Sequence, residues 1–310
     1  MKQLQRINRV TVIGMGALGT LYGNFFAERL GPQAVAFLAD RQRVKRYQAE
    51  GVTCNGKVCD FRFQTPDESN EPAELLIFAV KGTALEAAIQ LAKPYVNADT
   101  VILSVINGIS SEEMIAQALG EDQVIYSIAQ GMDAVKLENA LTYAHLGVLC
   151  IGILPAETAK QEKLAQVIEL FDRTGLPYVV EADIQHRLWS KWMLNVGVNQ
   201  VIMVTEGTYG TVQQSGEARD MMIAAMWEAL RVAEKEGISI TEKDLTDYVA
   251  LVDTLNPDGM PSMRQDGLAR RYSEVDFFAG TVLKKAAEYD LDVPVNRMLY
   301  QTIQELERTY

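Results

Sequence analysis

One short segment near the start of the chain limits the fold more than any other. Residues 9–19 read RVTVIGMGALG, so a β-branched run ends in the spacing Gly14-x-Gly16-x-x-Gly19 and continues into a helix-favouring segment. In this pattern the first glycine permits a tight turn, the second lets the backbone approach a pyrophosphate, and the third lets the helix pack closely on its strand. Free N–H groups at the start of such a helix attract phosphate. The residues predicted to bind a dinucleotide are Gly14, Met15, Gly16, Ala17, Leu18 and Gly19.

The order of strand-like and helix-like segments predicts two domains. Up to about residue 182, continuous apolar runs such as 75–80 and 100–105 alternate with helix-like segments, which indicates an α/β domain of Rossmann type with a parallel sheet. The pair Asn55-Gly56 between apolar residues predicts a β-hairpin with a type I′ turn. We therefore predict a dinucleotide-binding domain over residues 1–182 and an all-α domain over residues 183–310. The helix-length segments of the second domain are 183–204, 216–236, 241–253, 266–289 and 295–309.

Composition narrows the class of partner. The 310 residues carry a formal net charge of −12, which disfavours nucleic acid or an anionic membrane as a partner. The chain begins without a signal-peptide pattern, and its apolar runs are too short to span a bilayer. Its three cysteines match no common zinc spacing. We expect a cytoplasmic protein without a metal site that acts on a small molecule.

The end of the second predicted strand gives two opposing signals about the cofactor. An acidic residue there favours NAD by holding the ribose 2′-OH, whereas an arginine accommodates the 2′-phosphate of NADP. Residues 38–43 read LADRQR, so Asp40 and Arg41 supply one signal each. Lys81 directly follows the strand predicted over 75–80, where it can flank the adenine ribose and its phosphate. The residues by themselves leave both cofactors open.

A polar stripe stands out in the helical half. Lys191, Asn195 and Asn199 are spaced by four residues inside an apolar segment, which places them along one stripe of a helix. Polar groups in such surroundings are costly to bury unless they are paired or contact a ligand. Two amides can orient hydroxyl and carboxylate groups, and a partly desolvated lysine can act as a general acid. This stripe is the strongest candidate for the chemistry.

Other candidate groups are fewer. The two histidines, His145 and His186, have no acidic partner in a recognisable spacing, so we predict structural roles for both. Ser262 lies just ahead of a predicted helix start and can be a simple cap. Glu274 lies among apolar neighbours, where an acidic residue more often belongs to an exposed face. The residues alone leave Ser262 and Glu274 without an assigned role.

Five ordered motifs together resemble the ketopantoate reductase (2-dehydropantoate 2-reductase) family over nearly the whole chain. The resemblance implies a Rossmann-type domain followed by a helical domain like the C-terminal domain of 6-phosphogluconate dehydrogenase. It also implies NADPH-dependent reduction of 2-dehydropantoate to (R)-pantoate, a step of pantothenate and coenzyme A biosynthesis. The motifs are Gly14-Met-Gly-Ala-Leu-Gly19, Lys81, Ile106-Asn107-Gly108, Lys191-x-x-x-Asn195-x-x-x-Asn199, and Ser262-Met-x-Gln-Asp266 with Glu274 and Gly280.

The resemblance also implies a role for each matched residue. Lys191 would be the general acid that protonates the developing alkoxide, an electrostatic role suited to an ammonium group. Glu274 would hold Lys191 or the cofactor in place, and Asn107 would contact both cofactor and substrate. The side chains implied to hold the substrate's carboxylate and hydroxyl groups are Asn195, Asn199 and Ser262.

Two departures from the family pattern leave alternatives open. Where family members often continue into a Pro-rich turn and a further Asn-Gly, this chain has Gln200 and then Tyr209-Gly210, which predicts an altered outer substrate pocket. Asp40 leaves the preference for NADP over NAD open. The alternatives are an NAD-dependent D-2-hydroxyacid dehydrogenase acting on branched 2-oxo acids, and a non-catalytic dinucleotide-sensing protein. A homodimer is compatible with the apolar helical domain, although nothing in the sequence requires one.

Overall fold

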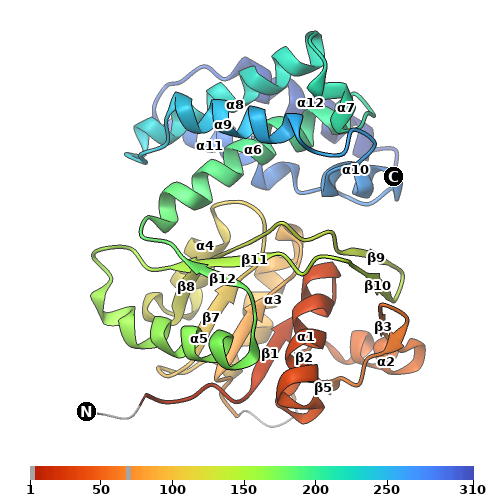
Figure 1. Ribbon diagram of the computed structural model, residues 1–310, viewed down its shortest axis with the longest axis vertical. Coiled ribbons are helices and arrows are strands. Elements are labelled where there is room, and N and C mark those ends of the chain that lie inside the picture. Colours follow the sequence, from red (N-terminus) through yellow and green to blue (C-terminus); the bar gives the residue numbers. More distant parts are fainter. Residues whose placement is uncertain (1–3, 68–70) are drawn as a thin grey trace. The chain divides into compact units, whose positions relative to one another are not determined.

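The computed structural model describes residues 4–67 and 71–310 (Figure 1). The chain forms two compact units. The first comprises Met1–Asn107 and Ser111–Ile184, and the second comprises Gly108–Ser110 and Gln185–Tyr310. Among the described residues, no helix is both long and apolar enough to cross a membrane.

An eight-stranded sheet lies at the centre of the first unit, in the order β12-β11-β8-β7-β6-β1-β2-β5 (Figure 1). Neighbouring strands run parallel, except that β8 and β11 pair antiparallel. Strands β1, β2, β6 and β7 are buried along their whole length, as expected for a sheet covered on both faces. The strands are β1 Val10–Ile13, β2 Val35–Leu38, β5 Arg62–Gln64, β6 Leu75–Phe78, β7 Val101–Ser104, β8 Val124–Gln130, β11 Val148–Gly152 and β12 Tyr178–Val180.

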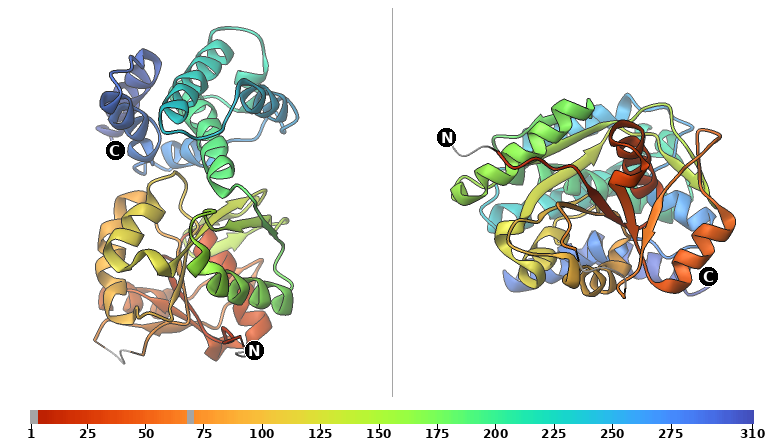
Figure 2. Two further views of the ribbon diagram at one scale, coloured as in Figure 1. Left: turned by 90° about the vertical axis from the view of Figure 1, so that its left-hand side faces the viewer. Right: turned by 90° about the horizontal axis from the view of Figure 1, so that it is seen from below.

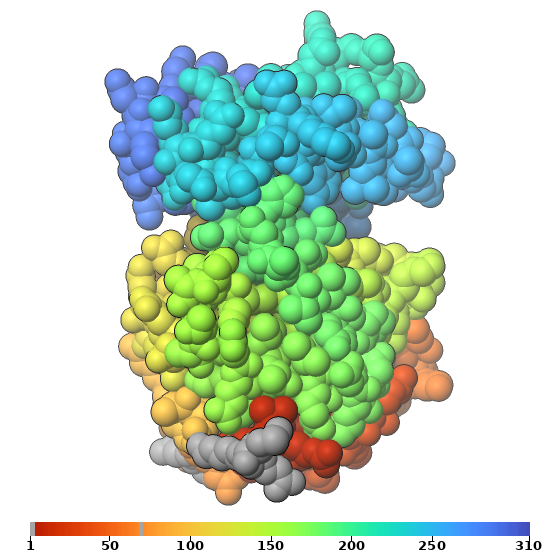
Figure 3. Space-filling view, turned by 60° about the vertical axis from the view of Figure 1, so that its left-hand side comes forward, coloured from red at the N-terminus to blue at the C-terminus, as the bar shows by residue number. Residues whose placement is uncertain are grey.

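Helices cover both faces of this sheet (Figures 1 and 2). On one face, the Phe26 ring of α1 stacks on the Phe171 ring of α5 at 6.4 Å between centroids. Figure 3 shows one side of this unit, with the green segment that contains α5 at the surface. The helices are α1 Ala17–Leu30, α2 Arg41–Glu50, α3 Leu85–Ala92, α4 Ser111–Leu119 and α5 Gln161–Thr174, with the 3-10 turns η1 Pro32–Ala34, η2 Gly82–Ala84, η3 Lys93–Tyr95, η4 Glu121–Gln123 and η5 Thr158–Lys160.

A second, small sheet in the order β4-β3-β10-β9 packs on α1 through a buried cluster of Leu21, Cys54 and Leu141. The hairpin predicted at Asn55-Gly56 is confirmed: both residues have positive φ (47° and 77°), as a type I′ turn requires. The second hairpin of this sheet was not predicted. Its strands are β9 Val135–Leu137 and β10 Ala140–Thr142, and those of the first are β3 Thr53–Cys54 and β4 Lys57–Val58.

The second unit is helical, and residues 185–310 contain no strand, as predicted. Its long helix α6 is buried over most of its surface and approaches α8 closely at Gly197, where an added Cβ would lie 2.5 Å from Met226 Cγ. The elements are α6 Ile184–Val204, α7 Tyr209–Gln213, α8 Glu217–Lys235, α9 Glu242–Asp253, α10 Ser262–Leu268, the 3-10 turn η6 Val275–Phe277, α11 Ala279–Glu288 and α12 Pro294–Glu307.

The prediction of a single helix over 266–289 is wrong. The chain instead forms α10, a loop, η6 and α11. Arg270 has φ +49°, a left-handed conformation that ends α10. The loop is then tied to α12, because the Ser273 backbone N–H donates to the Glu307 carboxylate at 2.8 Å. This long-range hydrogen bond leaves no local pattern in the sequence.

Candidate active site

At two of the three glycines in the loop between β1 and α1, neighbouring backbone atoms leave no room for a side chain. Gly14 has φ +99°, and a Cβ there would lie 2.5 Å from the Ala79 carbonyl oxygen. A Cβ on Gly19 would lie 1.9 Å from the Gly14 carbonyl oxygen. Both contacts are far inside van der Waals distance, so these two positions require glycine for the fold itself.

Gly16 differs from the other two glycines because nothing in the protein crowds it. An added Cβ would meet only the Ala79 carbonyl oxygen, at an ordinary 3.7 Å. Gly16 is the N-cap of α1, which has no side-chain cap and no acidic residue in its first turn. The first N–H groups of an α-helix need partners from outside the helix, and an anion can supply them. The residues at this helix start therefore fit the pyrophosphate of a dinucleotide.

This contrast gives a direct prediction for Gly16→Ala. The variant is expected to keep the wild-type Tm nearly unchanged, because the methyl group meets no protein atom closely. Its Kd for NADH and NADPH is expected to rise at least about tenfold, since the methyl group stands where a pyrophosphate approaches the backbone. Calorimetric titration and thermal unfolding measure the two quantities. Unaltered Kd values would show that no phosphate approaches Gly16.

Asp40 and Arg41 follow β2 at the same edge of the sheet, and both already have protein partners. Asp40 is the N-cap of α2, and its carboxylate accepts a hydrogen bond from the Arg43 backbone N–H at 2.8 Å. The Arg43 guanidinium lies 3.3 Å from the same carboxylate. Arg41 pairs with Asp67 at 2.8 Å. The acidic group is therefore built into the helix start, and both nearby guanidinium groups face a carboxylate.

The register of the parallel strands brings the remaining cofactor candidates to this edge. Ile13 pairs with Phe78, and Phe78 pairs with Ser104, so β1, β6 and β7 end level with one another. Lys81 follows β6 as the N-cap of η2, and Asn107 follows β7 and is half-buried. The structure thus brings the glycine loop, Asp40, Lys81 and Asn107 to the carboxyl edge of one sheet, where ligands bind in open α/β sheets.

Helix α6 carries the predicted polar stripe. Lys191 and Asn195 are half-buried, and Asn199 is only 6% exposed. The apolar residues between them are mostly buried. The side-chain amides of Asn195 and Asn199 make no hydrogen bond to residues 4–67 or 71–310. Neither amide is among the completely buried polar groups without a partner, so both remain within reach of a small molecule. The stripe therefore presents unsatisfied amide groups beside an ammonium group.

The turn that carries Glu274 is tied to the same helix. Trp192 Nε1 on α6 donates a hydrogen bond to the Phe277 carbonyl oxygen at 2.9 Å. Glu274 is the half-buried N-cap of η6, and its carbonyl accepts from the Phe277 N–H at 2.9 Å. The backbone of Gly108 also packs on the Phe277 ring, since a Cβ there would lie 3.3 Å away. No local pattern in the sequence indicates this convergence on Phe277.

Ser262 is placed differently from the expectation that it caps a helix. It is the exposed first residue of α10, and Pro261 takes the N-cap position. Helix α10 approaches α6 at Gly267, where an added Cβ would lie 2.6 Å from Met203 Sδ. Met203 is one turn beyond Asn199, so α10 lies at the Asn199 end of the stripe.

Comparison with known proteins assigns this arrangement to a family. Residues 10–154 match the family described as Ketopantoate reductase PanE/ApbA, and residues 183–307 match Ketopantoate reductase PanE/ApbA C terminal. The chain belongs to the ketopantoate reductase family. Members of this family are NAD(P)-dependent oxidoreductases, and the protein is an enzyme of this class.

Individual relatives agree with this family assignment. The 2-dehydropantoate 2-reductase of Vibrio cholerae serotype O1 is 27% identical over 301 residues, which are 97% of this chain and 98% of that protein. A PanE/ApbA family ketopantoate reductase from Ralstonia eutropha JMP134 has a TM-score of 0.82 at 22% identity, over 97% of this chain and 99% of that one. A D-mandelate dehydrogenase solved with NADH and anilino(oxo)acetate has a TM-score of 0.83 at 19% identity, with the same coverage. These structures confirm the predicted fold.

Two residues depart from the family pattern. Gln200 lies in the protein interior, and Tyr209 lies at the start of α7. Gln200 is completely buried, and its side chain bonds to the Val196 carbonyl, Asn296 and the Ala279 N–H. The prediction that Gln200 alters an outer pocket is therefore wrong: it connects α6 to α11 and α12. Tyr209 is the half-buried first residue of α7, where burial raises the pKa of its hydroxyl.

Both histidines have acidic partners that are distant in the chain. His145 Nδ1 lies 3.0 Å from Asp133, and His186 Nε2 lies 3.0 Å from Asp244. Hydrogen bonds from the His145 backbone and ring lower the pKa of Asp133 to about 2. The partners are 12 and 58 residues away in the chain, so no spacing rule identifies them. His145 lies outside the elements that carry the stripe and the glycine loop, whereas His186 lies on α6, the helix that carries the stripe. The structural role of each histidine stays a prediction.

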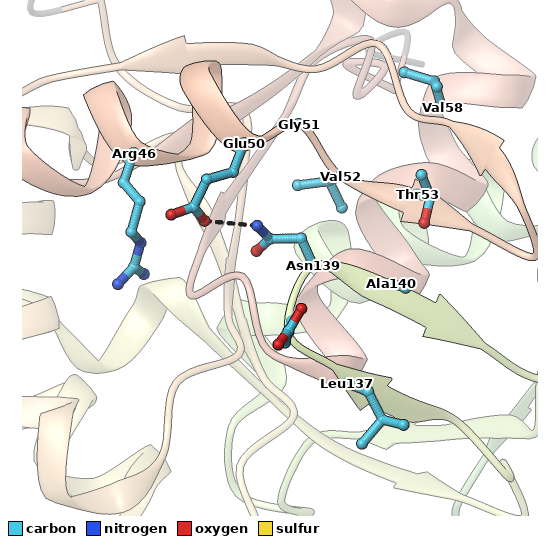
Figure 4. A pocket seen from close by; sticks show the side chains of 10 residues that line it. Arg46, Glu50, Gly51, Val52, Thr53, Val58, Leu137, Asn139 and Ala140 are labelled. Atoms are coloured by element: carbon cyan, nitrogen blue, oxygen red, sulfur yellow. Dashed lines mark hydrogen bonds between the residues drawn. The ribbon is translucent and has the colours of Figure 1, made fainter.

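An open hollow of about 860 Å³ lies between α2 and the small sheet, away from the predicted site residues. Figure 4 shows Arg46 and Glu50 of α2 on one side and Leu137 and Asn139 on the other, with Asn139 donating a hydrogen bond to Glu50 at 2.6 Å. It lies at the end of α2 opposite Asp40. None of the residues predicted to bind cofactor or substrate lines it.

Proposed function

We propose that the protein reduces 2-dehydropantoate to (R)-pantoate with NADPH, a step of pantothenate and coenzyme A biosynthesis. The observation that carries this proposal is the stripe on α6. Asn199 is 6% exposed, its side-chain amide makes no hydrogen bond to the described residues, and Lys191 lies on the same stripe. A 2-oxo acid with a hydroxyl group offers acceptors and donors for both asparagine amides. The name of the Vibrio cholerae relative, 2-dehydropantoate 2-reductase, supports the same substrate.

In this proposal the cofactor supplies the hydride and Lys191 supplies the proton. When bound, NADPH would supply the hydride for the C2 carbonyl carbon of the substrate. Lys191 Nζ donates a proton to the carbonyl oxygen as the C–O double bond becomes a single bond, and the lysine regains a proton from water. An ammonium group near that oxygen stabilises the negative charge that develops on it.

The other residues of the stripe and its surroundings bind and orient in this proposal. Asn195, Asn199 and Ser262 hold the carboxylate and hydroxyl groups of the substrate, and Glu274 holds Lys191 or the cofactor. On the first unit, Asn107 contacts cofactor and substrate. The groups assigned to the dinucleotide alone are the glycine loop Gly14–Gly19, Asp40, Arg41 and Lys81.

The direct experiment follows nicotinamide absorbance when purified protein is mixed with 2-dehydropantoate and NADPH. Oxidation of NADPH with formation of pantoate is expected. Absence of turnover at millimolar substrate with either cofactor would contradict the proposal. Tight dinucleotide binding without turnover on any 2-oxo acid would instead identify a dinucleotide-sensing protein.

A second candidate function is favoured by the end of β2: an NADH-dependent D-2-hydroxyacid dehydrogenase acting on other branched 2-oxo acids. A 2′-phosphate at this point would meet the Asp40 carboxylate, and Arg41 and Arg43 already pair with carboxylates. The ribose diol of NADH, by contrast, can donate hydrogen bonds to Asp40. A panel of branched 2-oxo acids with both cofactors separates this candidate from the first.

Asp40→Asn tests the role of this carboxylate without breaking the helix start. Asparagine caps helices as well as aspartate does, so the variant removes the charge and keeps the cap. The ratio of kcat/KM for NADPH over NADH is expected to rise about tenfold, since the repulsion of a 2′-phosphate is removed and the hydrogen bonds to the diol weaken. Asp40→Ala, which also removes the cap, should in addition lower stability by about 1 kcal/mol. An unchanged ratio in Asp40→Asn would exclude Asp40 from cofactor selection.

A further inference from the structure

A lysine from the small sheet reaches the glycine loop. Lys136 is the central residue of β9, and its neighbours Val135 and Leu137 are exposed, so its side chain points to the opposite, inner side of the strand. Lys136 Nζ donates a hydrogen bond to the Met15 carbonyl oxygen at 2.7 Å. Met15 directly precedes Gly16, the N-cap of α1. A long side chain from residue 136 thus ends at the loop predicted to bind phosphate.

The charge of Lys136 has no counter-ion in the described part of the chain. Among residues 4–67 and 71–310, no carboxylate forms an ion pair with it, and its one hydrogen bond is to a carbonyl. Burial, followed by the nearby Arg46 guanidinium, lowers the pKa of Lys136, whereas Cys59 and Glu50 act in the opposite direction. Partly buried cations are normally paired with an anion.

The surroundings of the glycine loop indicate which kind of anion would pair with Lys136. The start of α1 has no side-chain cap and no acidic residue, so its N–H groups also lack an anionic partner. Two sources of positive potential, the helix start and the Lys136 ammonium, therefore meet at one loop. We propose that Lys136 is a cofactor-binding residue that faces the pyrophosphate of the bound dinucleotide and holds the glycine loop through the Met15 carbonyl.

This inference rests on the proposed function for the identity of the ligand, and it gives the small sheet a role. The cluster of Leu21, Cys54 and Leu141 fixes this sheet to α1, the helix whose start carries the loop. The sheet therefore holds the lysine at a fixed position relative to the N-cap. The pyrophosphate is common to NADH and NADPH, so Lys136 contributes equally to the binding of both.

The experiment measures Kd for NADH and for NADPH by calorimetric titration at several salt concentrations. Lys136→Gln keeps an N–H donor without the charge, Lys136→Met removes both, and Lys136→Arg keeps the charge. Lys57→Met is the matched control, because Lys57 is exposed on β4, the strand at the opposite edge of the same sheet. Tm of each variant without nucleotide reports on folding.

The expected result is a Kd about 10- to 100-fold higher in Lys136→Gln and Lys136→Met for both nucleotides, with a shallower salt dependence. Lys136→Arg and Lys57→Met should stay close to wild type. Equal Kd values in all variants would overturn the inference, as would a loss in Lys136→Arg as large as that in Lys136→Met. A loss confined to NADPH would place Lys136 at the 2′-phosphate and also overturn it. Should Lys136→Met not fold, Lys136→Gln and Lys136→Arg decide by the same criteria.

These titrations do not depend on turnover. A protein that binds NADH through Lys136 and reduces no 2-oxo acid would contradict the proposed function and leave this inference standing. A protein that reduces 2-dehydropantoate with Kd values unaffected by Lys136→Gln would do the reverse.

Discussion

Lys191→Ala is expected to lower kcat about 10²- to 10⁴-fold with 2-dehydropantoate, the range typical for loss of a general acid. The lysine is the only ionisable group on the stripe it shares with Asn195 and Asn199, so neither amide can replace its proton. Kd for NADPH should change little, since Lys191 is not among the residues assigned to the dinucleotide. Steady-state kinetics and calorimetric titration together separate the two effects.

The matched control for this prediction is Lys284→Ala. Lys284 lies on α11 of the same unit, and its side chain is exposed. It should retain wild-type kcat and KM. A kcat for Lys191→Ala within threefold of wild type would remove Lys191 as the acid, whereas a collapse of NADPH affinity with unchanged kcat would make it a cofactor contact instead.

Gly19→Ala is expected to destabilise the first unit by about 3 kcal/mol and to abolish measurable dinucleotide binding. The new Cβ would lie 1.9 Å from the Gly14 carbonyl oxygen, so α1 or the loop must move away from β1. Thermal unfolding should show a Tm several degrees lower than that of wild type.

Gly16→Ala is the comparison variant, because it separates the effect of an added methyl group from the effect of a backbone clash. Both variants add one methyl group to the same loop, but only the one at Gly19 meets the backbone. If Gly19→Ala unfolded at the wild-type Tm and bound NADPH normally, the close packing of α1 on β1 would not be required for the site.

The sequence predicted those parts of the fold that depend on local patterns. The glycine spacing at residues 14–19 fixes a turn and a close helix contact within six residues, and Asn55-Gly56 fixes a hairpin through two positive φ angles. The stripe of Lys191 to Asn199 follows from helical periodicity alone. In each case the pattern and the structure that it predicts lie within nine residues of the chain.

The features that sequence reasoning missed depend on contacts between distant segments. Lys136 meets Met15 across 121 residues, and His186 meets Asp244 across 58. The break after α10 is stabilised by Glu307, 34 residues after Ser273. The β9–β10 hairpin turns at Glu138, a residue type that rarely adopts its φ of +49° and so gives no turn signal. Only the folded chain brings such partners together.

The division of the chain between the two units has a consequence for dissecting the protein. Gly108–Ser110, between β7 and α4, belong to the helical unit, and Gly108 packs on the Phe277 ring. A fragment that ends at Ile184 would retain this tripeptide but lose the surface against which it packs, and a fragment that begins at Gln185 would lack it. The helical unit is therefore not encoded by one continuous stretch, and cutting the chain once cannot release both units intact.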